Sequence, residues 1–173
     1  MPQEVSEMIF IADDQEIKAI ISLLYITGAR ISEILNLNND DITYHTENNS
    51  KYIRLRIRTL KQKKTGSPFV RLRFLEFNIN TPFIINFIEY LPSRAKHDKV
   101  FTRYRELAYY YIKKTNRYLS PHAFRHSRAQ KFADIIVNPF KLMALTGHVD
   151  IKNVMKYVDT SKIALKEFRD KYD

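Results

Sequence analysis

The 173-residue sequence contains no cysteine, 3 glycines and 6 prolines. The lack of cysteine excludes a disulfide scaffold, a cysteine-ligated zinc site and a cysteine nucleophile, and is compatible with a reducing, cytoplasmic compartment. The scarcity of glycine and proline disfavours irregular architectures. No run of about 18 apolar residues occurs, so the sequence predicts no membrane span.

Acidic residues are the minority among the charged ones. Asp and Glu number 19 against 29 Lys and Arg, which gives a formal net charge of +10. On a small domain this surplus favours a polyanionic partner, first nucleic acid and second an anionic membrane surface. A basic protein whose charge serves only solubility is the alternative. The 45% hydrophobic content is enough for a buried core, and the length fits one domain.

Apolar spacing predicts helices on both sides of a short strand region. Residues 14–38 carry helical apolar stripes that Gly28 interrupts. More helices are expected within 81–158, including one over 103–117, and a charged tail helix is expected over 161–172. Three helix starts are predicted where a capping side chain precedes proline, at Thr81-Pro82, Ser120-Pro121 and Asn138-Pro139.

Residues 41–75 instead follow the period of a β-strand, with the first strand over 41–46. Two further segments alternate apolar residues with arginines, over 52–60 and 69–75. The apolar set, expected in the core, is Ile53, Leu55, Ile57, Val70, Leu72 and Phe74. The arginines are expected on the opposite, solvent-exposed face: Arg54, Arg56, Arg58, Arg71 and Arg73. This face either contacts DNA phosphates or has no partner other than water. The predicted fold class is therefore mainly α with a small three-stranded antiparallel β-sheet.

A basic protein that acts on a phosphodiester needs three kinds of group. Cations bind the non-bridging oxygens, a nucleophile attacks, and an acid protonates the leaving oxygen. Arginine suits the first task because its planar fork matches two phosphate oxygens. The sequence has no obvious carboxylate cluster for a metal, so we expect no metal and no cofactor.

Two segments offer paired polar groups at a helix start. The first is Thr27-Gly28-Ala29-Arg30-Ile31-Ser32-Glu33, in which Glu33 lies one helical turn after Arg30. We expect Glu33 to support the Arg30 guanidinium; an ordinary surface ion pair is the alternative. In Ser120-Pro121-His122-Ala123-Phe124-Arg125-His126, His122 and Arg125 share a face where the helix dipole favours an anion. A solvated capping turn is the alternative there.

A third segment reads Leu145-Thr146-Gly147-His148-Val149-Asp150, and Tyr157 follows nine residues after His148. Together the three segments resemble the tyrosine recombinase (phage integrase) family, which carries an Arg in a T-G-x-R-x-S-E-L-like segment, then H-x-x-R, L-G-H and a Tyr about nine residues later. The likeness covers about residues 14–158. It implies a catalytic domain that cuts and rejoins double-stranded DNA through a 3′-phosphotyrosine.

The resemblance also implies roles for single residues. Arg30 and Arg125 would bind the scissile phosphate, His148 would donate a hydrogen bond to it, and Glu33 would support Arg30. His122 would accept a proton from the nucleophile, Tyr157. The family's general-acid lysine falls in Lys61-Gln62-Lys63-Lys64-Thr65-Gly66. Lys64 is the assignment, with Lys61 and Lys63 left open as alternatives or as phosphate contacts.

The sequence departs from the family pattern in two places. Thr146 stands where a bulky apolar residue commonly precedes Gly-His, and Val149-Asp150 replaces a small polar pair. The family's N-terminal DNA-clamping domain is expected to be absent, so residues 1–173 are expected to form a single catalytic domain. The tail over 161–173 would dock onto a neighbouring protomer in a dimer or tetramer on DNA, or pack in cis. A type IB topoisomerase and an inactive DNA-binding regulator of the same fold are the competing functions.

Overall fold

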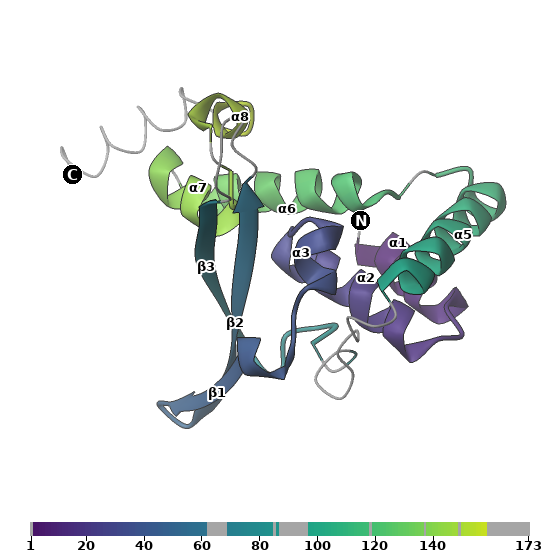
Figure 1. Ribbon diagram of the computed structural model, residues 1–173, viewed down its shortest axis with the longest axis horizontal. Coiled ribbons are helices and arrows are strands. Elements are labelled where there is room, and N and C mark those ends of the chain that lie inside the picture. Colours follow the sequence, from purple (N-terminus) through teal and green to yellow (C-terminus); the bar gives the residue numbers. More distant parts are fainter. Residues whose placement is uncertain are drawn as a thin grey trace.

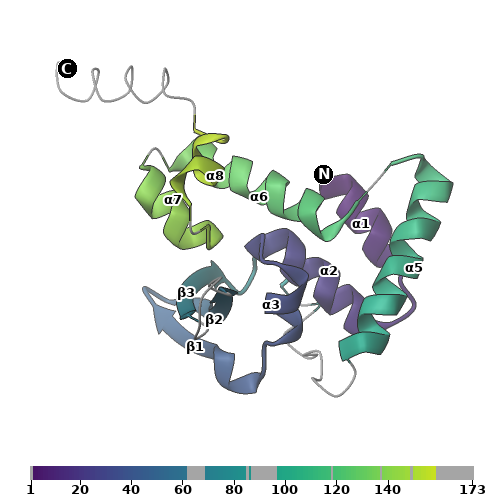
Figure 2. The ribbon, with the colours of Figure 1, turned by 45° about the horizontal axis from the view of Figure 1, so that its top comes forward.

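The computed structural model describes residues 2–61, 69–84, 86, 97–117, 119–136, 138–148 and 150–158. A three-stranded antiparallel sheet lies beside a group of helices, and α6 (Pro121–Ile135) extends from the α7–α8 end to the α1–α5 end (Figures 1 and 2). The predicted fold class is therefore confirmed. None of the described helices is both long and apolar enough to cross a membrane.

Three helices precede the sheet: α1 (Pro2–Ile11), α2 (Gln15–Thr27) and α3 (Ile31–Leu35), followed by the 3₁₀ turn η1 (Asn39–Asp41). The Asp14 carboxylate caps α2, and Gly28 ends it in a left-handed conformation with φ +61°. Because α2 packs against α1, α3, α5 and α6, it is the central helix of the core. Helices were expected before the sheet only over residues 14–38, and α1 adds one ahead of them that buries Val5 and Met8.

The sheet consists of β1 (Ile42–Glu47), β2 (Ser50–Lys61) and β3 (Phe69–Asn78) in the order β1-β2-β3. Asn48 and Asn49 connect β1 to β2, both at positive φ. A two-residue hairpin needs this conformation at both central positions, and asparagine tolerates it well. The predicted strands are confirmed, with both β2 and β3 longer than expected.

The predicted orientation of β3 is wrong. Arg73 pairs with Ile57 and is 4% exposed, whereas Leu72 and Phe74 are 48% and 54% exposed. Directly paired residues share a face of the sheet, so Arg73 lies on the core side and Leu72 on the outer side. Apolar residues occur on both faces of β3, as the adjacent pair Phe74-Leu75 shows. The alternation therefore did not determine which face is buried.

The outward arginines of β2 are ion-paired within the protein. Arg56 Nε and Arg58 Nη1 donate to the fully buried Asp41 carboxylate at 2.9 and 2.6 Å. Arg54 pairs with Glu76 on β3 at 2.9 Å. These pairs attach η1 to β2 and hold the arginines in place. The side chains of Lys61, Val70 and Arg71 lie outside the described residues.

Four helices follow the sheet in the described part of the chain: α5 (His97–Thr115), α6, α7 (Pro139–Thr146) and α8 (Ile151–Met155). Ser120 and Asn138 cap α6 and α7 as predicted. The helix predicted to start at Thr81-Pro82 does not start there. Residues 81–84 form turns, with Phe83 at φ +73°, because these turns bury Ile84 and bring Phe83 against Tyr25. The tail over 161–173 lies outside the described residues.

Candidate active site

The buried Glu33 carboxylate binds two arginines, Arg30 and Arg73. It accepts hydrogen bonds from the Arg30 backbone N–H at 2.9 Å, from Arg30 Nη1 at 2.8 Å and from Arg73 Nη2 at 3.1 Å. Burial alone would raise the pKa of Glu33, but the Arg73 charge and the Arg30 hydrogen bonds outweigh it and hold the pKa below its usual range. Glu33 is therefore a carboxylate that links α3 to β3.

Arg73 connects this cluster to α7. Its side chain is 2% exposed, and its Nη1 donates to the Leu145 carbonyl at 2.6 Å, close to the end of α7. Its Nε is buried without a hydrogen-bond partner among the described residues. Arg73 thus fixes the start of the segment that leads from α7 to His148.

Arg125 enters the site from the second turn of α6. It is 6% exposed, and its Nη1 donates to the carbonyl of Gly28, the residue that ends α2, at 2.9 Å. Its Nη2 is buried and has no partner in the described part of the chain. Burial and the charges of Arg30 and Arg73 lower the pKa of Arg125 to about 10, so it is still a cation at neutral pH.

The three guanidiniums face a single carboxylate. Arg30, Arg73 and Arg125 carry three positive charges and Glu33 one negative charge, so two positive charges are not balanced within the cluster. A small cavity of about 30 Å³ adjoins it, lined by Arg30, Ser32, Glu33, Asn36 and Arg58. Arg73 and Arg125 are desolvated and each has a buried donor left over, and Arg30 is partly exposed beside them; such a set of donors suits an oxyanion such as a phosphodiester.

His148 and Tyr157 approach this cluster from the C-terminal side. α7 ends at Gly147, with φ +68°, and His148 follows it directly. The Tyr157 ring lies with its centroid 6.1 Å from that of His148 and 5.8 Å from that of His126. The Tyr157 hydroxyl shares a short hydrogen bond with His126 Nδ1. Four of the predicted site residues, Arg30, Arg125, His148 and Tyr157, are thus brought together by their elements.

Electrostatics set the protonation of these groups. Burial, followed by the charges of Arg125, Arg30 and Arg73, lowers the pKa of His148 to about 4, so His148 is neutral at neutral pH. Burial raises the pKa of Tyr157, and Arg125 opposes this only in part. Tyr157 is therefore a protonated phenol at neutral pH, and its use as a nucleophile requires a proton acceptor.

His122 is not the histidine that contacts Tyr157. It is exposed on the first turn of α6 and has no hydrogen bond or ring contact within the described part of the chain. His126, one turn later on the same helix, takes that position. The predicted Lys63 and Lys64 lie outside the described residues, as does the side chain of Lys61.

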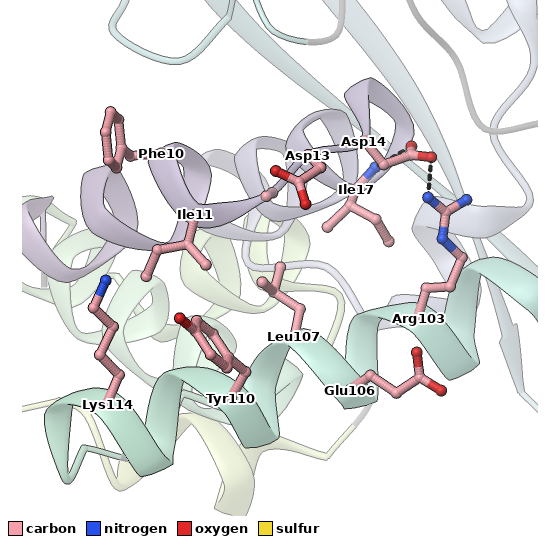
Figure 3. Close-up of a pocket in the computed structure, with 11 residues that line it drawn as sticks. Phe10, Ile11, Asp13, Asp14, Ile17, Arg103, Glu106, Leu107, Tyr110 and Lys114 are labelled. Carbon is pink, nitrogen blue, oxygen red and sulfur yellow. Dashed lines mark hydrogen bonds and ion pairs between the residues drawn. The ribbon is translucent and has the colours of Figure 1, made fainter.

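A separate hollow of about 550 Å³ lies between the α1–α2 junction and α5. Figure 3 shows Ile11, Ile17 and Leu107 along it, with the ion pair of Asp14 and Arg103 at one end. None of the predicted site residues lines it.

A comparison with known proteins decides the family. The model of the phage integrase family matches residues 1–163. The chain belongs to this family. Tyrosine recombinase XerA of Pyrococcus horikoshii is 28% identical over 172 residues, which cover 96% of this chain and 57% of the relative. Tyrosine recombinase XerD of Staphylococcus haemolyticus is 23% identical over 163 residues, which cover 90% and 54%.

A solved structure gives the same fold for this phage integrase family member. The XerH site-specific recombinase bound to its difH substrate has a TM-score of 0.62 at 16% identity, covering 99% of this chain and 52% of that one. The chain spans about half the length of the curated relatives it matches.

Sequence reasoning missed two residues of this integrase-family site. Arg73 was expected on the solvated face, and only the adjacent apolar pair Phe74-Leu75 signalled that β3 has two apolar faces. His126 stood within the motif around Arg125 without an assigned role. Its spacing of one helical turn from His122 was the available signal, because residues four apart share a helix face.

Gly147→Ala is expected to destabilise the protein by about 1–3 kcal/mol. An alanine Cβ at this position would lie 3.2 Å from Thr59 Oγ1 and 3.3 Å from Arg73 Cδ, in a left-handed conformation that L-residues disfavour. Urea denaturation of both proteins measures the difference in the free energy of unfolding. An unchanged midpoint would contradict the close packing of the α7 end against Arg73.

Proposed function

We propose that this chain is the catalytic part of a site-specific DNA recombinase that cuts and rejoins DNA strands through Tyr157. The observation that carries the proposal is the juxtaposition of the Tyr157 hydroxyl, two imidazoles and the buried Arg125. A protonated phenol beside basic nitrogens and desolvated cations suits attack on a phosphodiester. The Tn1549 transposon integrase, which has the same fold and was solved in complex with circular intermediate DNA, supports DNA as the substrate.

In the proposed cleavage step, the Tyr157 oxygen forms a bond to phosphorus while the bond from phosphorus to the 5′-oxygen breaks. Arg30 and Arg125 bind the non-bridging oxygens, and Glu33 and Arg73 hold Arg30 and its surroundings in place. His126 takes the Tyr157 proton; His122, assigned by the family resemblance, stays an alternative. Lys64, or else Lys61 or Lys63, supplies the proton to the departing 5′-oxygen.

Rejoining is the reverse reaction. A 5′-hydroxyl attacks the 3′-phosphotyrosine and restores the phosphodiester, and the Tyr157 phenol recovers its proton. The energy of the broken bond is kept in the covalent intermediate, so the reaction needs no nucleotide cofactor, and the proposed scheme uses no metal. Arg54, Arg56, Arg58 and Arg71 are proposed to contact the DNA backbone. Arg58 has the strongest case, because it lines the same cavity as Arg30.

Two other functions use the same fold. A type IB topoisomerase would relax supercoils without yielding recombinant products, and an inactive regulator would bind DNA without cutting it.

Self-association on DNA through residues 161–173 is also proposed, in line with the family resemblance. The whole-protein activity is proposed for a chain that spans about half the length of the curated relatives it matches.

A covalent-trap assay tests the proposal. The protein is incubated with a pool of duplexes that carry a randomised centre and a nick, so that the cut fragment diffuses away and religation fails. We expect a protein–DNA adduct that resists SDS and maps by peptide mass to Tyr157. A pool that is bound but yields no adduct would favour the regulator, and relaxation of supercoiled plasmid without recombinants would favour the topoisomerase.

A further inference from the structure

Thr146 makes two hydrogen-bond contacts with its hydroxyl at the end of α7. The residue is 3% exposed. Its Oγ1 lies 2.7 Å from the Leu142 carbonyl oxygen and 2.7 Å from His148 Nδ1. The position is also one of the two at which the sequence departs from the family pattern.

The two contacts together determine where the protons are. A carbonyl oxygen only accepts, so the single hydroxyl hydrogen of Thr146 points at Leu142. The Thr146 oxygen then has only lone pairs to offer His148, and His148 Nδ1 must be the donor. A neutral imidazole carries one N–H, so the hydrogen on Nδ1 leaves Nε2 as an acceptor.

We propose that Thr146 is a positioning residue that fixes His148 as the Nδ1–H tautomer, so that His148 donates through Nε2 only after taking up a proton. This inference rests on the proposed function and on the role that the family resemblance implies for His148, a hydrogen bond donated to the scissile phosphate. It adds that binding of the phosphate is coupled to protonation of His148. Without the hydroxyl this contact would no longer hold the hydrogen on Nδ1, and the neutral imidazole would be able to donate through Nε2.

The charges around His148 make this coupling strong. Arg30, Arg73 and Arg125 approach it from α3, β3 and α6, with His126 and Tyr157 at its side and Glu33 between the arginines. Burial and these cations keep the pKa of the His148 imidazole near 4 in the absence of DNA. A bound phosphate opposes the cations and raises that pKa, so at a pH between the two values DNA binding takes up as much as one proton and tightens as the pH falls.

Nitrogen NMR of the DNA-free protein tests the tautomer directly. In the wild type at neutral pH, the His148 ring should show a protonated Nδ1 and an unprotonated Nε2. Thr146→Val keeps the size of the side chain and removes the hydroxyl, so the ring should shift towards the Nε2–H form. Thr146→Ser keeps the hydroxyl and should retain the wild-type pattern. A wild-type ring protonated on Nε2, or an unchanged ring in Thr146→Val, would overturn the proposal.

Affinity for a mixed-sequence DNA duplex, measured between about pH 5 and pH 8, tests the coupling. For the wild type and Thr146→Ser, His148 should contribute up to about tenfold in affinity per pH unit. Thr146→Val should show a smaller pH dependence, and the other histidines cancel in that difference. Equal slopes in all three proteins would overturn the coupling. Failure of the covalent trap with the NMR result intact would reject the recombinase function and leave the tautomer assignment standing.

Discussion

Tyr157→Phe is expected to abolish covalent attachment to DNA, with a loss on the order of a thousandfold or more. The substitution removes one oxygen atom, which is the proposed nucleophile, and keeps the ring that lies beside His126 and His148. The other consequence is the lost hydrogen bond to His126, worth about 0.5–1.5 kcal/mol of stability. The variant should therefore fold and bind DNA while the SDS-resistant adduct disappears.

A second tyrosine provides a matched control. Tyr110 is 51% exposed on α5, and Tyr110→Phe removes the same oxygen from a side chain outside the arginine cluster. This variant should form the adduct at the wild-type rate. The control matters because the chain has 11 tyrosines. An adduct that persists in Tyr157→Phe, or that maps to another tyrosine, would assign the chemistry elsewhere.

Features that depend on neighbouring residues could be predicted from the sequence. Gly28 and Gly147 end their helices in left-handed conformations, and Ser120 and Asn138 cap the helices that follow them. Each of these features is decided within one helical turn, so the local residue types determine it.

Features that depend on pairing between distant segments could not be predicted. Arg73 lies in the core because β3 pairs with β2 in a register that places it beside Ile57, and because Glu33 compensates its charge. Neither partner is near Arg73 in the sequence. The meeting of Arg30, Arg125 and Tyr157 was likewise expected only through the family resemblance, because spacing along the chain does not define distance in space.

Glu33→Gln is expected to destabilise the protein by about 3–5 kcal/mol, a large part of the roughly 5–15 kcal/mol that stabilises a typical domain. Glutamine has nearly the same shape, but it removes the negative charge that compensates Arg73, whose side chain is 2% exposed. The new amide group also adds hydrogens where Arg30 and Arg73 need acceptors. Glu76→Gln is the matched control: Glu76 pairs with Arg54 at the surface and should cost less than about 1 kcal/mol.

The pH dependence separates the lost charge from a packing defect. Because the folded protein holds the pKa of Glu33 below its usual range, the carboxylate contributes stability that is fully present above its unfolded pKa of about 4.3. That contribution is lost as the pH falls through the lower folded pKa. The difference between wild type and Glu33→Gln in urea denaturation should therefore be largest at neutral pH and shrink in acid. A difference that stays constant down to the acid limit would mean that the altered hydrogen bonds of the glutamine amide destabilise the variant, and that the lost charge does not.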